Sequence, residues 1–229
     1  MLDPRSVRPD QVTGTVSSGN LPKLSPAQAK FGYVPDRSSL RPGDLLLTRT
    51  LDFELTSAGI SFTQRLQRNE HTDWTHAAIY ADDWRVFEAT PESNVASANI
   101  VNWMPNTAIM VRRPVKFDHL SKDDAMLAGM RLVMEAALMQ GNATYGKTTA
   151  AMILLRVLKA FRNIPAPVQA EQKAGSIICS GLYAKCFNIT TGEHLTPKEM
   201  LRSDEPVTPA LLAGLDTLRP VDIGWCRIV

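Results

Sequence analysis

Short apolar runs bounded by turn residues mark three β-strands in the first half of the chain. The stretch "RPGDLLLTRT" opens with a Pro-Gly-Asp turn and predicts a strand over 44–49. Two apolar runs within 74–90 flank an Asp-Asp turn, which indicates an antiparallel hairpin. A third strand over 107–115 ends at Pro114, because proline has no N–H to continue a ladder. We therefore expect an antiparallel sheet of at least three strands.

Helical spacing replaces this pattern in the second half. Ser121 and Asp124 resemble a capping box, and the apolar repeat that follows stops before Gly141, as a helix does. A second helix is expected over 148–161, and a third is expected to begin near Cys179. These helices are expected to pack on the sheet.

The end of the chain predicts short elements, and its beginning predicts none. Threonine followed by proline, as N-cap and first helical residue, predicts short helices at Pro197 and Pro209, and a strand is expected over 225–229. Residues 1–40 are rich in Pro, Ser and Gly and are expected to form an irregular N-terminal arm, with 41–229 as one domain. The predicted fold class is α+β, a small antiparallel sheet packed with helices.

The composition is that of a globular domain and argues against several partners. A hydrophobic share of 44% and a charged share of 21% argue against disorder. The 25 basic and 23 acidic residues are interspersed, so nucleic acid is not an expected partner. The apolar segment 148–161 is interrupted by Arg156 and falls short of the ~20 residues that cross a bilayer, so stable membrane insertion is not expected. No apolar h-region follows the first charges, so we expect synthesis in the cytoplasm without a signal peptide.

The three cysteines, at 179, 186 and 226, are expected to be free thiols, because an odd number in a chain of this length does not indicate a disulfide framework. Cys179 lies in "GSIICSGLY", and a cysteine among apolar residues is usually an inert packing residue. If a helix begins at Cys179, however, unpaired N–H groups and the helix dipole lower the pKa of its thiol. Cys186 follows at ordinary core spacing and is expected to be structural.

A nucleophilic thiol needs an imidazole to take its proton and a third group to orient that imidazole. His76 and Glu88 lie on the two strands of the predicted hairpin and could supply both groups. A two-residue Asp82-Asp83 turn would place them on opposite faces, whereas a three-residue loop or a β-bulge would place them on one face. We predict the second arrangement, because it leaves the other face wholly apolar and buried.

A metal site is the weaker interpretation. His71 and His76 are five positions apart, Cys179 and Cys186 are seven apart, and neither is a common zinc spacing. We expect no metal and no cofactor.

Five segments, in their order along the chain, resemble one known superfamily: "RPGDLLLTR", "THAAIY" with a following "VFEA", "ATYG", "ICSGL" and "PVTPALLAG". They span about residues 40–214 and resemble the circularly permuted branch of the NlpC-like papain-fold cysteine peptidases and amidases, which includes YiiX-like proteins and relatives of lecithin:retinol acyltransferase. In that branch the strands that carry the base precede the helix that carries the cysteine, and this chain has the same order. The resemblance implies that 41–229 is a permuted papain-like catalytic domain.

The resemblance also implies roles for the matched residues. Cys179 would be the nucleophile, His76 the general base and Glu88 the group that orients the histidine. The tyrosine of "ATYG" matches a family tyrosine near the nucleophile. The expected substrate contacts are Tyr145, Ser180 and Trp74.

The implied function is that of a cysteine peptidase or amidase that cleaves an amide bond by acyl transfer. The family suggests a peptidoglycan stem peptide as substrate. A cell-wall substrate without a signal peptide suggests export by a dedicated secretion system to a target-cell periplasm, as an antibacterial effector with an immunity protein as partner. Two alternatives stay open: a lipid acyl hydrolase or acyltransferase whose segment 148–161 faces lipid, and a catalytically silent interaction module.

Overall fold

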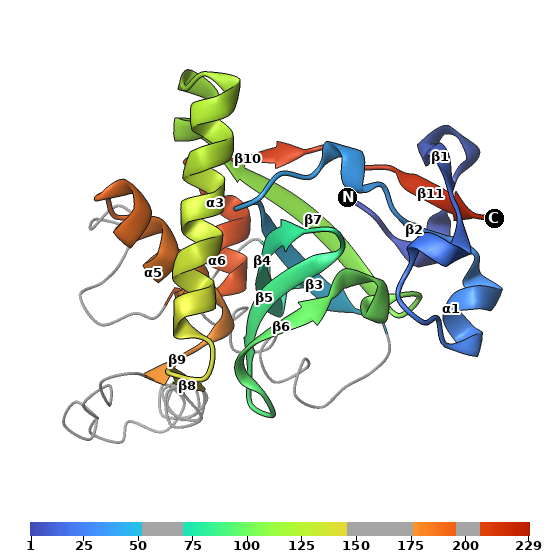
Figure 1. The fold of residues 1–229 in the computed structure, drawn as a ribbon, viewed down its shortest axis with the longest axis horizontal. Coiled ribbons are helices and arrows are strands. Elements are labelled where there is room, and N and C mark those ends of the chain that lie inside the picture. Colours follow the sequence, from blue (N-terminus) through green and yellow to red (C-terminus); the bar gives the residue numbers. More distant parts are fainter. Residues whose placement is uncertain (52–70, 146–175, 196–206) are drawn as a thin grey trace.

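The computed structural model describes residues 1–51, 71–145, 176–195 and 207–229, and it has an α+β architecture (Figure 1). Its main sheet has six strands in the order β10-β7-β3-β4-β5-β6, with every neighbouring pair antiparallel. The strands are β3 (Leu45–Thr50), β4 (His76–Asp82), β5 (Arg85–Thr90), β6 (Asn94–Asn99), β7 (Thr107–Pro114) and β10 (Leu218–Val221).

The three predicted strand regions are confirmed. The first corresponds to β3, the hairpin to β4 and β5, and the third to β7, whose last residue, Pro114, still pairs with Leu218. The sequence did not indicate β6 and β10, which form the two edges of the sheet. Their sequences, NVASAN and LRPV, are short and lack the apolar alternation that marks a strand.

A layer of helices covers one face of this sheet (Figure 1). The layer contains α3 (Lys122–Met139), α5 (Cys179–Thr191) and α6 (Pro209–Gly214). The predicted caps are present, since the hydroxyl of Ser121 accepts from the N–H of Asp124 and that of Thr208 accepts from the N–H of Leu211. The helices predicted over 148–161 and at Pro197 lie outside the described residues. No helix within the described ranges is long and apolar enough to cross a membrane.

The two ends of the chain meet on the other face of the main sheet. A second sheet has the order β1-β11-β2, with β1 parallel to β11 and β11 antiparallel to β2. The elements here are β1 (Val12–Val16), α1 (Pro26–Phe31), β2 (Tyr33–Pro35) and β11 (Trp225–Ile228). Short 3-10 helices are found at Pro4–Ser6, Pro9–Gln11, Ser18–Asn20, Arg37–Ser39, Ile100–Trp103 and Val115–His119. The first 40 residues are therefore more regular than their composition indicates.

Both faces of the β4–β5 hairpin are buried. Ala77 and Ile79 pack beneath the helices, whereas Tyr80 and Val86 pack against a second core that includes Trp225. The apolar face that we expected to be buried is therefore buried, and the opposite face, with Tyr80 and Val86, is covered as well. The physical reason is that the first 35 residues and β11 form a second covering layer, which the irregular composition of the N-terminal segment conceals.

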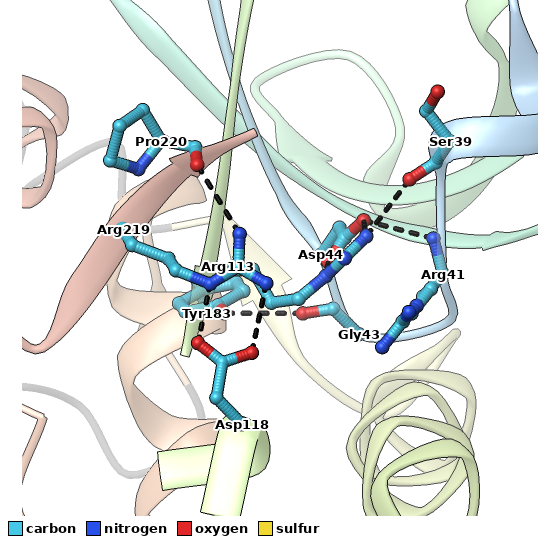
Figure 2. Close-up of polar contacts among 9 residues, drawn as sticks. All are labelled: Ser39, Arg41, Gly43, Asp44, Arg113, Asp118, Tyr183, Arg219 and Pro220. Carbon is cyan, nitrogen blue, oxygen red and sulfur yellow. Dashed lines mark hydrogen bonds and ion pairs between the residues drawn. The ribbon is translucent and has the colours of Figure 1, made fainter. Parts of the chain in front are cut away.

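A buried ion pair fixes the turn that leads into β3 (Figure 2). The guanidinium of Arg113 makes two 2.7 Å hydrogen bonds to the carboxylate of Asp44, and these side chains are 7% and 1% exposed. The backbone N–H of Arg41 also donates to Asp44, at 2.9 Å. A buried charge is stable only with such complete pairing. The Tyr183 hydroxyl, one helical turn after Cys179, donates to the carbonyl of Gly43 in the same turn at 3.1 Å.

The same turn sets the position of α3. Gly43 has φ of +84°, a left-handed conformation that favours glycine, and a Cβ on it would lie 2.8 Å from the Cα of Gly129. A Cβ on Gly129 would lie 1.9 Å from the carbonyl oxygen of Pro42. Two glycines thus allow the backbone of α3 to touch the turn, so one turn of chain positions both α3 and α5.

Candidate active site

The helix α5 places Cys179 at its first position. The N-cap residue, Ile178, has no side-chain oxygen to bond the first N–H groups of the helix, so these groups stay available near the sulfur. The helix is anchored by buried side chains at Leu182, Tyr183, Cys186 and Phe187. Cys179 itself is 8% exposed, so its side chain is mostly buried but still reaches solvent.

The β4–β5 hairpin brings His76 and Glu88 onto one face. Cross-strand pairing of Ala78 with Glu88 and of Tyr80 with Val86 gives the two side chains the same orientation relative to the sheet. A β-bulge at Ala81 supplies the necessary extra residue. The Nε2 atom of His76 lies 2.7 Å from Oε2 of Glu88.

The connecting turn has two residues, Asp83 and Trp84, with φ of 40° and 71°. Positive φ at both positions is the conformation of a type I′ hairpin turn. The shared face therefore comes from the bulge and not from a longer loop. Of the two routes that the sequence left open, the structure uses the bulge.

The thiol of Cys179 meets the ring of His76, with which it forms a side-chain hydrogen bond. Because Nε2 of the ring faces Glu88, Nδ1 is left to face the sulfur. The sulfur also accepts from the backbone N–H groups of Ala77 and Ser180. Ala77 lies one residue before the paired part of β4 and β5, so its N–H can turn to the thiol.

These contacts shift both pKa values in the direction of an ion pair. Burial by itself lowers the pKa of His76, but the thiolate of Cys179, and after it Glu88, raise this pKa from 6.5 to about 10. Burial by itself raises the pKa of Cys179, but the imidazolium of His76 and the N–H groups of Ala77 and Ser180 hold it below the ordinary value of 9.0. The geometry thus favours a thiolate beside an imidazolium.

The three expected substrate contacts have different surroundings. Ser180 is fully buried, and its hydroxyl donates to the carbonyl of Val207 at 2.7 Å, so its side chain ties α5 to the segment before α6. Trp74 is 5% exposed and packs in the core that contains Cys179, with the guanidinium of Arg49 5.9 Å from its ring centroid.

The backbone of Tyr145 lies beside the strand that leads to the nucleophile. It belongs to β8 (Thr144–Tyr145), which pairs in parallel with β9 (Ser176–Ile177), and Tyr145 is opposite Ile177. Ile177 precedes Cys179 by two residues. The backbone of Thr144 and Tyr145 is therefore near the start of α5.

The other two cysteines have the properties of structural thiols. Cys186 is fully buried, and burial raises its pKa to about 12. Burial also raises the pKa of Cys226, and the nearby carboxylate of Asp36 adds to this effect. All three cysteines are free. Across the described residues, His, Cys, Asp and Glu side chains form no group of three or more that could hold a metal ion.

Two parts of the site have no counterpart in the sequence analysis. The N–H of Ser180 belongs to the helix start that the sequence predicts, whereas the N–H of Ala77 also reaches the sulfur and has no signal in the side-chain pattern, because any residue except proline offers such a donor. The contact between Tyr183 and Gly43 joins segments 140 positions apart in the chain. In the sequence, the "PGD" turn is the one feature that points to this contact, and by itself the turn indicates only the start of a strand.

Comparisons with known proteins find structural similarity only. No protein-family model matches the chain, and no curated protein matches it. Among solved structures, the chain is similar to that of the metalloprotein yiiX from Escherichia coli O157:H7. The identity is 16% and the TM-score is 0.49, over 80% of this chain and 97% of that one.

Proposed function

We propose that this protein is a cysteine hydrolase that cleaves an amide bond through a covalent thioester. The observation that supports this most strongly is the linear array of Cys179, His76 and Glu88, in which one ring nitrogen faces the thiol and the other lies 2.7 Å from a carboxylate oxygen. A nucleophile, a base and a group that orients the base are the minimum set for acyl transfer.

In the first half of the reaction, the sulfur of Cys179 attacks the carbonyl carbon of the amide. The C–N bond then breaks, and the imidazolium of His76 gives its proton to the leaving amine. In the second half, neutral His76 takes a proton from water, whose oxygen attacks the thioester and releases the acid and the thiol. Glu88 keeps the ring in the orientation that each proton transfer needs.

The start of α5 would stabilise the negative oxygen that forms during both attacks. Its N–H groups and the positive end of the helix dipole lie where the sulfur lies, so an oxygen on the attacked carbon develops its charge close to them. The same feature supports a low thiol pKa, which links nucleophile activation to transition-state stabilisation.

We also propose that the α+β fold is a circularly permuted papain-like fold. The support is the order of its parts, since β4 and β5, which carry the base and its partner, precede α5, which carries the thiol. The helix packs against these strands, and this contact brings positions 76 and 179 together.

For the substrate we propose a peptide of the peptidoglycan stem, on the basis of the sequence motifs. Export to a target-cell periplasm as an antibacterial effector, with an immunity protein in the producing cell, belongs to the same proposal.

The decisive experiment incubates wild type and Cys179→Ala with purified sacculi and, separately, with phospholipid vesicles, and identifies products by mass spectrometry. We expect amide cleavage of sacculi by wild type and none by the variant. Cys226→Ser, which changes a thiol away from the site, is the matched control and should keep full activity. Lipid products would instead indicate the acyltransferase-like alternative, and no product from either substrate would refute the hydrolase.

Iodoacetamide labelling at mildly acidic pH tests the thiol itself. An activated thiolate reacts there while ordinary thiols do not. We expect label on Cys179 well before Cys226, whose pKa is raised by burial. Equal and slow labelling of both would contradict the proposed ion pair.

A further inference from the structure

The longest described helix, α3, is apolar on the face that points away from the core. One side of it is buried through Ala125, Gly129, Leu132 and Ala136. The opposite side carries large apolar residues whose exposed fractions run from 39% to 62%: Met126, Leu127, Met130, Met134 and Leu138. They recur at steps of three and four residues, so they form one stripe along the helix. We call these five residues the outer stripe.

An apolar stripe that faces water is unfavourable unless another surface covers it. A helix that covers a core normally presents polar residues on its outer side. Between Met126 and Leu138 only Arg131 and Glu135 are polar, while the remaining residues are apolar or glycine. Contiguous exposed apolar side chains on a soluble protein mark an interaction surface more often than an empty one.

The two charges beside the stripe indicate which partner covers it. Arg131 and Glu135 are four positions apart, one helical turn, and so border the stripe on the same side. Within the described part of the chain, neither of them forms an ion pair. An antiparallel copy of α3, related by a two-fold axis level with Val133, would place each Arg131 beside the other copy's Glu135. The surface is therefore complementary to itself.

A lipid surface fits these residues less well. Helices that lie on membranes combine an apolar face with Lys, Arg and aromatic residues. From Lys122 to Met139 the helix has two basic residues, Lys122 and Arg131, against the acidic residues Asp123, Asp124 and Glu135, and it has no aromatic residue. Its charge would oppose an anionic membrane, whereas a second copy satisfies both border charges.

We propose that the outer stripe is a self-association surface, through which two copies of this chain pair by antiparallel packing of α3. The pairing is isologous, so that each stripe covers the other and two Arg131–Glu135 ion pairs form across the two-fold axis. This assignment is independent of the hydrolase chemistry, because α3 carries none of the three proposed catalytic residues.

Sedimentation velocity over a wide range of protein concentration tests the proposal. Wild type should shift from one chain to two as concentration rises. The double variant Met130→Glu/Met134→Glu should weaken the dimer at least about tenfold, because it places charges in the centre of the contact. Ile189→Glu is the matched control, since it also makes an exposed apolar residue acidic, but on α5, and it should dimerise as wild type does.

Charge reversal identifies the geometry. Arg131→Glu and Glu135→Arg should each weaken the dimer, and the double reversal should restore it, because each new charge again faces its opposite. Wild type that remains monomeric at every concentration, or a double reversal no better than either single one, would overturn the proposal. Stripe-dependent flotation of a monomeric protein with phosphatidylcholine vesicles would assign the surface to lipid instead.

Discussion

Removal of the Cys179 thiolate should lower the pKa of His76 by a predictable amount. In the native site burial opposes the imidazolium, yet the pKa rises from 6.5 to about 10 because Cys179, and then Glu88, favour the charge. The net rise is therefore about 3.5, which corresponds to about 5 kcal/mol of preference for the imidazolium. The two partners together must supply at least this much.

Cys179 is the larger contributor of the two, so its thiolate accounts for a large part of the net rise. In Cys179→Ser, which keeps the size of the side chain but not its charge, we expect the pKa of His76 to fall from about 10 toward its ordinary value of 6.5. By thermodynamic reciprocity the same coupling holds the pKa of the thiol down in wild type.

NMR titration of the His76 ring provides the assay, with His76→Asn identifying its signal among the four histidines. Wild type should show a ring that stays protonated through neutral pH and loses its proton toward about 10, while the serine variant titrates clearly lower. Activity should follow the same pair, rising as the thiol ionises below 9.0 and falling as the imidazolium is lost near 10. Equal titration of His76 in both proteins would refute the ion pair.

Three further substitutions separate chemistry from folding. Glu88→Gln should lower kcat/KM by about 10²- to 10⁴-fold in steady-state assays, because it removes the charge that orients the ring, and full activity would exclude this role. Gly129→Ala should lower the free energy of unfolding in urea by about 1–3 kcal/mol, since its Cβ overlaps the carbonyl of Pro42, and a stabilised protein would contradict the close approach. Asp44→Asn should cost about 3–5 kcal/mol in the same assay by leaving Arg113 buried without its counter-charge, and a loss under about 1 kcal/mol would show that the pair is not essential.

The sequence predicted the parts of the fold whose signals are local. The periodicity of α3 with its Ser121 cap, the start of α5 at Cys179 and the two strands of the hairpin all follow from residues close together in the chain. The α+β class follows from these elements. The edge strands β6 and β10 escaped prediction because their pairing partners, and not their own sequences, make them strands.

The candidate site, like the fold, was predicted from the sequence only where its signals are local. The sequence left two possibilities for the hairpin, with His76 and Glu88 either on the same face or on opposite faces. The outcome depends on a bulge at Ala81, a small residue with no distinctive turn chemistry. The approach of Cys179 to His76 joins positions about a hundred residues apart, and spacing alone does not determine it. The motif order supplied that expectation, and packing of α5 on the sheet provides the contact.

The second sheet also bears on how the protein is made. Its first strand, β1, is bonded to β11, which the ribosome synthesises more than two hundred residues later. Contacts so distant in sequence form late in folding, because the entropy cost of closing a long loop comes before the favourable energy of the contact. The rear of the β4–β5 hairpin, whose first strand begins at His76, therefore receives its full cover only after β11 has been synthesised.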